Sequence, residues 1–158
     1  MQNKPFLSGF TLIEMLVVIT ILMLMLGWGL ASYISFNEKQ QLTGAAKQLQ
    51  VYLRGLQKKA RVGDRPGGCD RLFSYTLTIG ANSNLVIMEA NCENGDYTTD
   101  QYSMSGGVKA QANVEVVFKV LQGGATSLDE IILVKEDATY QFAVTPGGEI
   151  TEGAMVQP

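Results

Sequence analysis

Hydrophobic residues fill one unbroken stretch near the start of the chain. Residues 10–31 are apolar, small or hydroxyl-bearing, with Glu14 as the exception. As an α-helix this stretch would be about 33 Å long, enough to cross the roughly 30 Å hydrocarbon core of a bilayer. A helix satisfies its own backbone hydrogen bonds in lipid, so it is the conformation that such a stretch adopts there. The pattern predicts a transmembrane helix over residues 10–34.

From residue 35 the pattern becomes amphipathic. "VGDRPGG" ends it, because Gly63 can cap a helix and Pro66 cannot continue one. We therefore predict that the same helix continues over residues 35–62. Apolar residues at steps of three and four form one stripe on it, which we expect to face a core: Leu42, Ala45, Ala46, Leu49, Leu53, Leu56 and Ala60.

Residues 63–158 alternate with period two and are punctuated by turn residues. The pattern predicts about four to six antiparallel strands in a head domain. An apolar-striped helix needs a sheet face to cover, so the fold class is α+β, with a long helix packed on an antiparallel sheet. The expected strands are 71–79 and 84–90 around "GANS", 113–121, 130–134 and 139–144 around "KEDA", and a short one at 149–151.

Composition offers little for catalysis. The 158 residues include no histidine, which removes the commonest general base and metal ligand at neutral pH. No nucleophile elbow, phosphate loop or dinucleotide fingerprint occurs. The segment "CENGDYTTD" carries oxygen ligands that suit Ca²⁺, but it lacks EF-hand spacing, and we interpret it as a polar turn. We expect no enzyme activity, no metal and no cofactor.

Glu14 is the residue that a plain membrane anchor leaves unexplained. A carboxylate well inside hydrocarbon costs about 3 kcal/mol, although near the end of a span it reaches the interface more cheaply. A cleaved secretory signal fits poorly, because the apolar run is too long and no convincing small-residue cleavage site follows it.

The residues around Glu14 resemble the prepilin signature of type IV pilins and type II secretion pseudopilins. A short leader, "MQNKPFLSG" at residues 1–9, ends in Gly9, and Phe10 and Glu14 follow at the family's positions. The resemblance implies cleavage between Gly9 and Phe10 by a prepilin peptidase on the cytoplasmic side, and N-methylation of Phe10. It also implies that residues 10–34 become a filament core, where Glu14 neutralises the new amine of Phe10. A buried pair of this kind costs far less than a lone buried charge.

The order of helix and strands is similar to a type IV pilin-like fold. The head is most similar to H-type pseudopilins and FimT-like minor pilins, through "LTGAAKQLQVYLRGLQKKARVGD", "VVFKVLQGG" and "YQFAVTPGGEI". The resemblance implies a structural subunit, such as a minor pilin, of a type IV pilus or related filament. The alternatives are a pseudopilin of a type II secretion system and a DNA-binding minor pilin for DNA uptake.

The same resemblance implies partners and a location. The partners would be other pilin or pseudopilin subunits, the prepilin peptidase, an inner-membrane assembly platform, and lipid before assembly. The chain would cross the bacterial inner membrane once with its head outside the cytoplasm, and then enter a cell-surface pilus or a periplasmic pseudopilus. Nucleic acid is not an expected partner, because the head is acidic.

Cys69 and Cys92 lie at the outer ends of the first predicted hairpin, which brings them toward each other. An exported domain favours a disulfide between them, and two free thiols are the alternative in a reducing host.

Charge is divided unevenly along the chain. Residues 38–71 carry eight basic and three acidic residues, a net of +5, whereas residues 72–158 carry three basic and eleven acidic residues, a net of −8. One interpretation is two ordinary solvated surfaces. The other is that the basic helix of one subunit faces the acidic head of another, which would guide assembly.

Overall fold

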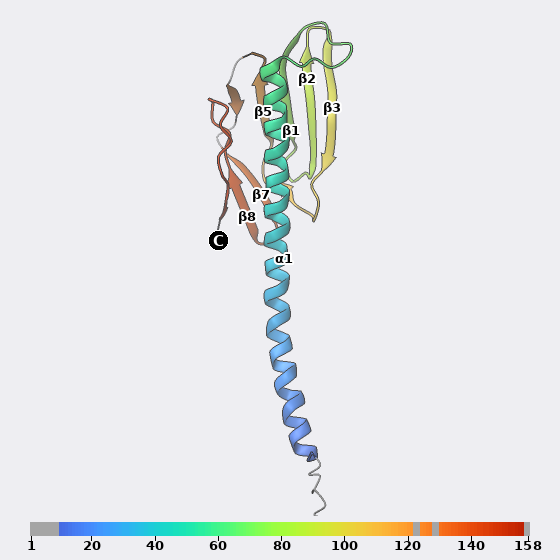
Figure 1. Ribbon diagram of the computed structural model, residues 1–158, viewed down its shortest axis with the longest axis vertical. Helices are drawn as coiled ribbons and strands as arrows, with labels where there is room; N and C mark the ends of the chain where they lie inside the picture. Colours follow the sequence, from blue (N-terminus) through green and yellow to red (C-terminus); the bar gives the residue numbers. More distant parts are fainter. Residues whose placement is uncertain (1–9, 122–123, 128–129, 157–158) are drawn as a thin grey trace, which may run out of the picture. The chain divides into compact units, whose positions relative to one another are not determined.

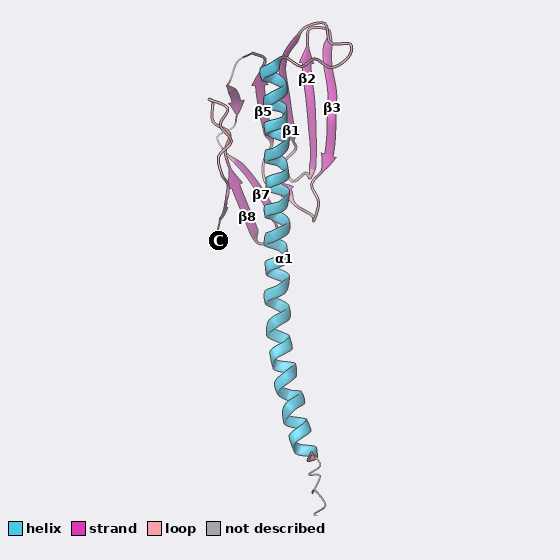
Figure 2. Cartoon of the chain, viewed as in Figure 1, coloured by secondary structure: helices cyan, strands magenta, loops and turns pink. Residues whose placement is uncertain are grey.

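The computed structural model describes residues 10–121, 124–127 and 130–156, excluding the side chains of residues 27–32 and 127. One helix, α1 (Leu12–Val62), precedes all the strands (Figure 1). The chain divides into two compact units, Met1–Asn37 and Glu38–Pro158, so the first part of α1 belongs to one unit and the second part to the other. The fold is α+β, as the sequence predicts, with helix first and antiparallel strands after it (Figure 2).

The second part of α1 buries one face against the strands of its own unit. All seven residues of the predicted stripe are at most 3% exposed and join a single hydrophobic cluster with residues of both sheets. Tyr75, Leu77, Phe118 and Leu133 are among the strand residues of that cluster. The stripe is therefore confirmed as the helical side of the core, which the 3.6-residue period of the sequence specifies.

The helix ends through a glycine C-cap. Gly63 has a φ of +66°, and its amide donates to the carbonyl of Ala60. The next amide, of Asp64, donates to the carbonyl of Lys59. This pair of bonds is a Schellman motif, in which a left-handed residue satisfies the last helical carbonyls. Glycine adopts that conformation without the strain that a Cβ would bring.

The first sheet holds five strands in the order β3-β2-β1-β5-β6, and neighbours are antiparallel. The predicted hairpin around "GANS" is confirmed as β1 and β2, with Ile79 opposite Val86. The strand predicted at 113–121 is confirmed as β5. The bounds are β1 (Leu72–Ile79), β2 (Leu85–Cys92), β3 (Gly95–Ser103), β5 (Val114–Lys119) and β6 (Ala125–Ser127).

The second sheet holds four antiparallel strands in the order β4-β7-β8-β9. The predicted hairpin around "KEDA" is confirmed as β7 and β8, with Lys135 opposite Ala138. The two amides Gln50 Nε2 and Gln57 Nε2 of α1 donate to the carbonyls of Thr151 and Gly148, which ties the helix to the segment between β8 and β9. The bounds are β4 (Lys109–Ala110), β7 (Ile131–Lys135), β8 (Ala138–Phe142) and β9 (Ala154–Val156).

The interpretation of residues 92–100 as a polar turn is wrong. Residues 95–103 form β3, which pairs with β2 from Cys92–Gly95 to Leu85–Ser103. The strand lies at the edge of its sheet and is mostly exposed, so it needs no hydrophobic alternation to form. Asn94-Gly95, between two strand-forming segments, is the hairpin signal that identifies it.

The prediction of a short strand at residues 149–151 is also wrong. The structure has one isolated bridge there, between Val144 and Ile150, and a strand only at β9. The turn at residues 145–148 brings Ile150 opposite Val144, just after β8, before the chain continues into β9, which pairs with β8. Nine strands occur within the described residues, more than the sequence predicts, because β3, β4, β6 and β9 are short or polar.

Candidate assembly site

The first turn of α1 is capped by the residues of the sequence signature. Thr11 precedes the helix, and its hydroxyl and carbonyl both accept from the amide of Glu14, at 3.3 and 3.1 Å. Glu14 stands three residues after this cap, which is the T-x-x-E spacing of a capping box. The positive end of the helix dipole favours a carboxylate at this position. The sequence reasoning missed this local role, although the spacing "TLIE" carries its signal.

The apolar residues that follow Glu14 are exposed in the single chain. The exposed fractions of the large apolar side chains from Met15 to Leu26 run from 46% at Val18 to 71% at Met25. Before Glu14, Phe10 is 74% exposed and Leu12 is 85% exposed. A continuous run of exposed apolar side chains is unusual on a soluble monomer and marks a surface that binds a partner or a membrane. This half of the helix therefore has an apolar surface that the described residues of its own chain leave exposed.

Phe10 is exposed and precedes α1 by two residues, and Glu14 lies in the first turn of the helix. Gly9, the predicted residue before the cleavage point, lies outside the described residues. Within residues 10–156 as described, no lysine or arginine nitrogen lies within 4.0 Å of the Glu14 carboxylate. In this part of the chain, Glu14 is exposed and has no cation beside it.

The head carries a disulfide between Cys69 and Cys92, with Cα atoms 5.6 Å apart. It links the segment after α1 to the end of β2. The side-chain Nδ2 of Asn94 and the hydroxyl of Tyr97 both donate to the carbonyl of Gly68, which precedes Cys69. Covalent and hydrogen bonds thus hold the β2–β3 turn against the segment that follows the helix.

A groove of about 460 Å³ runs between α1 and the β8–β9 side of the head. Lys47 and Arg54 line its helical wall, and Tyr140 and Glu152 line the other. Burial, and then the nearby Glu152 carboxylate, raise the pKa of Tyr140 above its ordinary value. Sequence reasoning did not single out this groove, although a seven-residue spacing places Lys47 and Arg54 on one helical face.

Side chains that could bind a metal do not gather in the part of the chain that the structure describes. Asp96 accepts from Nδ2 of Asn91, and Asn91 Oδ1 accepts from the hydroxyls of Ser74 and Thr76. The oxygen-rich segment after Cys92 is therefore used in bonds across the sheet.

Residues 8–30 match the family model for the prokaryotic N-terminal methylation motif. Searches of curated proteins and of solved structures found no match. Within the described residues, no helix meets the combined length and hydropathy criterion for a membrane span.

The match covers the signature and the first half of α1. It indicates a pilin-like prepilin of the type IV pilus and type II secretion class. For such a chain the motif implies anchoring in a membrane, processing by a prepilin peptidase, and assembly with other pilins. It points to a structural subunit, in agreement with the α+β fold.

Proposed function

We propose that this chain is a minor structural subunit of a type IV pilus or a related filament. In this proposal the peptidase cleaves between Gly9 and Phe10, and Phe10 is then N-methylated. The observation that carries the proposal is the methylation motif at the start of a helix whose apolar surface is exposed, followed without interruption by a helix-and-sheet head.

Glu14 acts in this proposal as the partner of the Phe10 amine in an assembled bundle. The capped turn supports this role, because it holds the Glu14 carboxylate at the N-terminal end of α1, close in sequence to the amine that cleavage would create on Phe10. Once neighbouring helices exclude water, each charge needs the other, since an unpaired buried charge is strongly destabilising. The pair then favours one register between subunits over others.

Before assembly, residues 10–34 would hold the chain in the inner membrane as a single span with the head outside the cytoplasm. The exposed apolar side chains support this, because lipid covers them without cost to the backbone. The disulfide supports export of the head, since disulfides persist in oxidising compartments. The assembly platform and sister subunits then replace lipid around α1.

A pseudopilin of type II secretion is the alternative within the same machinery, since it shares the signature. A DNA-binding minor pilin would use the exposed cations of α1. The many carboxylates of residues 72–158 oppose that use, because they repel phosphate.

Mass spectrometry of the mature chain from its host tests the proposal. We expect a new N-terminus at Phe10 carrying a methyl group. Gly9→Val should leave the leader attached, because the peptidase must approach the backbone closely at a glycine, and Ser8→Ala serves as the neighbouring control. An intact Met1 in the wild-type chain would contradict the proposal and leave a plain anchor. Gene deletion scored separately for surface pili and for protein secretion distinguishes pilin from pseudopilin.

A further inference from the structure

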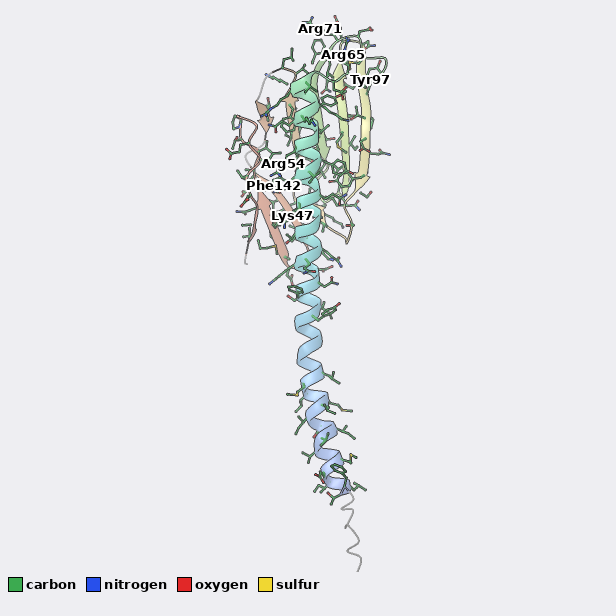
Figure 3. The ribbon with its side chains drawn as sticks, in the orientation of Figure 1. Lys47, Arg54, Arg65, Arg71, Tyr97 and Phe142 are labelled. Carbon is green, nitrogen blue, oxygen red and sulfur yellow. A yellow bond between two sulfur atoms is a disulfide. The ribbon has the colours of Figure 1, made fainter. Side chains whose placement is uncertain are left out.

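The groove between α1 and the β8–β9 side of the head has one cationic wall. Lys47, Gln50 and Arg54 follow one another at steps of three and four, so they lie on one face of the helix. Lys47 and Arg54 are exposed and about 10 Å apart along the helix axis. Figure 3 labels both on the part of α1 that packs on the strands. Among the described residues, neither makes an ion pair within 4.0 Å, so both can bind an anion.

The opposite wall of the groove has a tyrosine and a carboxylate. Tyr140 of β8 lies against Gly153, where an added Cβ would overlap the tyrosine ring and lie 2.7 Å from the carbonyl oxygen of Gln141. A larger residue at position 153 would therefore displace the ring. Glu152, which precedes this glycine, is exposed and has no cation within 4.0 Å in the described part of the chain. The wall thus presents a hydroxyl group that can donate and a carboxylate that can accept.

Two polar side chains of the groove are buried, yet each keeps a polar atom without a partner in the described chain. Tyr140 is 6% exposed, and its hydroxyl makes no hydrogen bond to the described residues. Gln50 is 8% exposed, and its Nε2 donates to the carbonyl of Thr151. Its Oε1 accepts no hydrogen bond from the same described residues. Buried polar side chains normally have their hydrogen bonds satisfied. Because these two line the groove, a ligand seated there can supply the missing bonds.

We propose that this groove binds an acidic saccharide, such as a short chain of uronic acids. Lys47 and Arg54 bind its carboxylates, and a guanidinium can do so with two parallel hydrogen bonds. Gln50, Tyr140 and Glu152 bind its hydroxyl groups, which donate as well as accept. The groove, about 460 Å³ in volume, is within the size range of small-molecule sites. The inference concerns the head alone, so it goes beyond the proposed role in a filament and does not depend on it.

The two walls together favour a sugar acid over a bare phosphate or an acidic peptide. Glu152 repels a group that carries only negative charge, but it accepts a hydrogen bond from a hydroxyl group. Phosphate at neutral pH is mainly an acceptor, and the acidic side chains of a peptide have no hydroxyl group beside the carboxylate. Val51 adds apolar surface beside the two cations, which suits the C–H face of a sugar ring. A uronic acid combines a carboxylate, hydroxyl groups and C–H surface on one ring.

Calorimetric titration of the full-length chain in detergent micelles tests the site. The probes are digalacturonate and its uncharged counterpart digalactose, which lacks the carboxylates. We expect digalacturonate to bind at least about tenfold more tightly, because only this sugar can pair with the two cations. The absence of digalacturonate binding, or equal affinity for the two sugars, would overturn the inference. Tighter binding of tetra-aspartate or of inorganic phosphate would overturn it as well, because the ligand would then not be a saccharide.

Substitutions in the two walls give a second readout. Lys47→Gln with Arg54→Gln should weaken digalacturonate binding about tenfold or more. Tyr140→Phe keeps the ring and removes only the hydroxyl group, and should weaken binding about fivefold. Lys109→Gln with Lys119→Gln is the matched control, because it removes the same charge at exposed lysines outside the groove, and it should bind as the wild type does. Near-UV circular dichroism verifies that each variant is folded. An equal loss in the control, or unchanged binding by either folded groove variant, would contradict the proposed site.

Discussion

The two halves of α1 share one continuous helix but differ in what covers their apolar side chains. In the first half, Leu16 is 56% exposed, and so are its apolar neighbours to comparable degrees. In the second half, Leu49 is fully buried against the sheets. Leucines of the second half are therefore covered by the chain's own sheets. Leucines of the first half are left for something other than the described chain to cover.

This difference indicates what each half of the helix packs against. A half that buries its stripe in its own core contributes to the stability of the monomer. A half that leaves its apolar surface open must find lipid or other helices. Substitutions that act on one half and spare the other separate stability from assembly.

The largest effect on assembly is expected from Glu14→Ala. Removing one partner of a pair that becomes buried on assembly leaves the Phe10 amine unpaired, so incorporation should fall about tenfold or more. Processing should persist, because the cleavage point at Gly9–Phe10 is unchanged. Sheared filaments are quantified by immunoblot, and mass spectrometry reads the mature N-terminus. Glu38→Ala, in the other half of the same helix, is the matched control. Normal incorporation of Glu14→Ala would remove the proposed role.

The largest effect on stability is expected from Leu49→Ala. Truncating a fully buried leucine leaves a cavity and lowers the free energy of unfolding of the head by about 3 kcal/mol. Leu16→Ala, in the exposed half, should change it by less than about 0.5 kcal/mol. Urea unfolding in detergent, followed by near-UV circular dichroism, measures both. Similar losses in the two variants would break the distinction between the halves.

A comparable or smaller loss of stability of the head is expected when the disulfide is removed. Cys69 and Cys92 are 23 residues apart, and opening a loop of that length costs about 3 kcal/mol in the chain-entropy model. We expect Cys69→Ser with Cys92→Ser to unfold at lower urea, while the exposed half of α1 keeps its helical signal. Ser103→Ala with Ser105→Ala is a control that changes two exposed serines of the head. An unchanged urea midpoint would show that the disulfide does not contribute to the stability of the head.

The sequence predicted the helix, its buried stripe and its glycine cap because each depends on local periodicity or a single turn. It also predicted the hairpins whose strands alternate, such as β1 with β2. It failed at β3, because an edge strand needs no buried face and its polar residues look like a loop. The groove lined by Lys47, Tyr140 and Glu152 could not be predicted either, since only the folding of distant strands brings its two walls together.

The smallest effects on stability are expected at two tyrosines packed beside the second half of α1, and they should differ between the two. The Tyr75 hydroxyl donates to the carbonyl of Asp64 at 2.7 Å, and fixes the segment after the helix. The Tyr102 hydroxyl is buried without a hydrogen-bond partner in the described chain, and its ring stacks on Tyr52 at 4.3 Å. Tyr75→Phe should therefore cost about 1 kcal/mol, whereas Tyr102→Phe should be neutral or slightly stabilising, because it removes an unsatisfied polar group.

The pH dependence of the two variants sharpens this comparison. Burial raises the pKa of Tyr75 and of Tyr102 above 10.0, so above pH 10 the folded head holds protons that the unfolded chain has lost. Stability is then complete below pH 10 and falls as pH rises further. Tyr102→Phe removes one such group, and its unfolding free energy should fall less steeply than that of the wild type in alkaline urea titrations. A Tyr102→Phe head as sensitive to alkali as the wild type would indicate that water reaches this hydroxyl, and that the second half of α1 is less closely covered than its stripe implies.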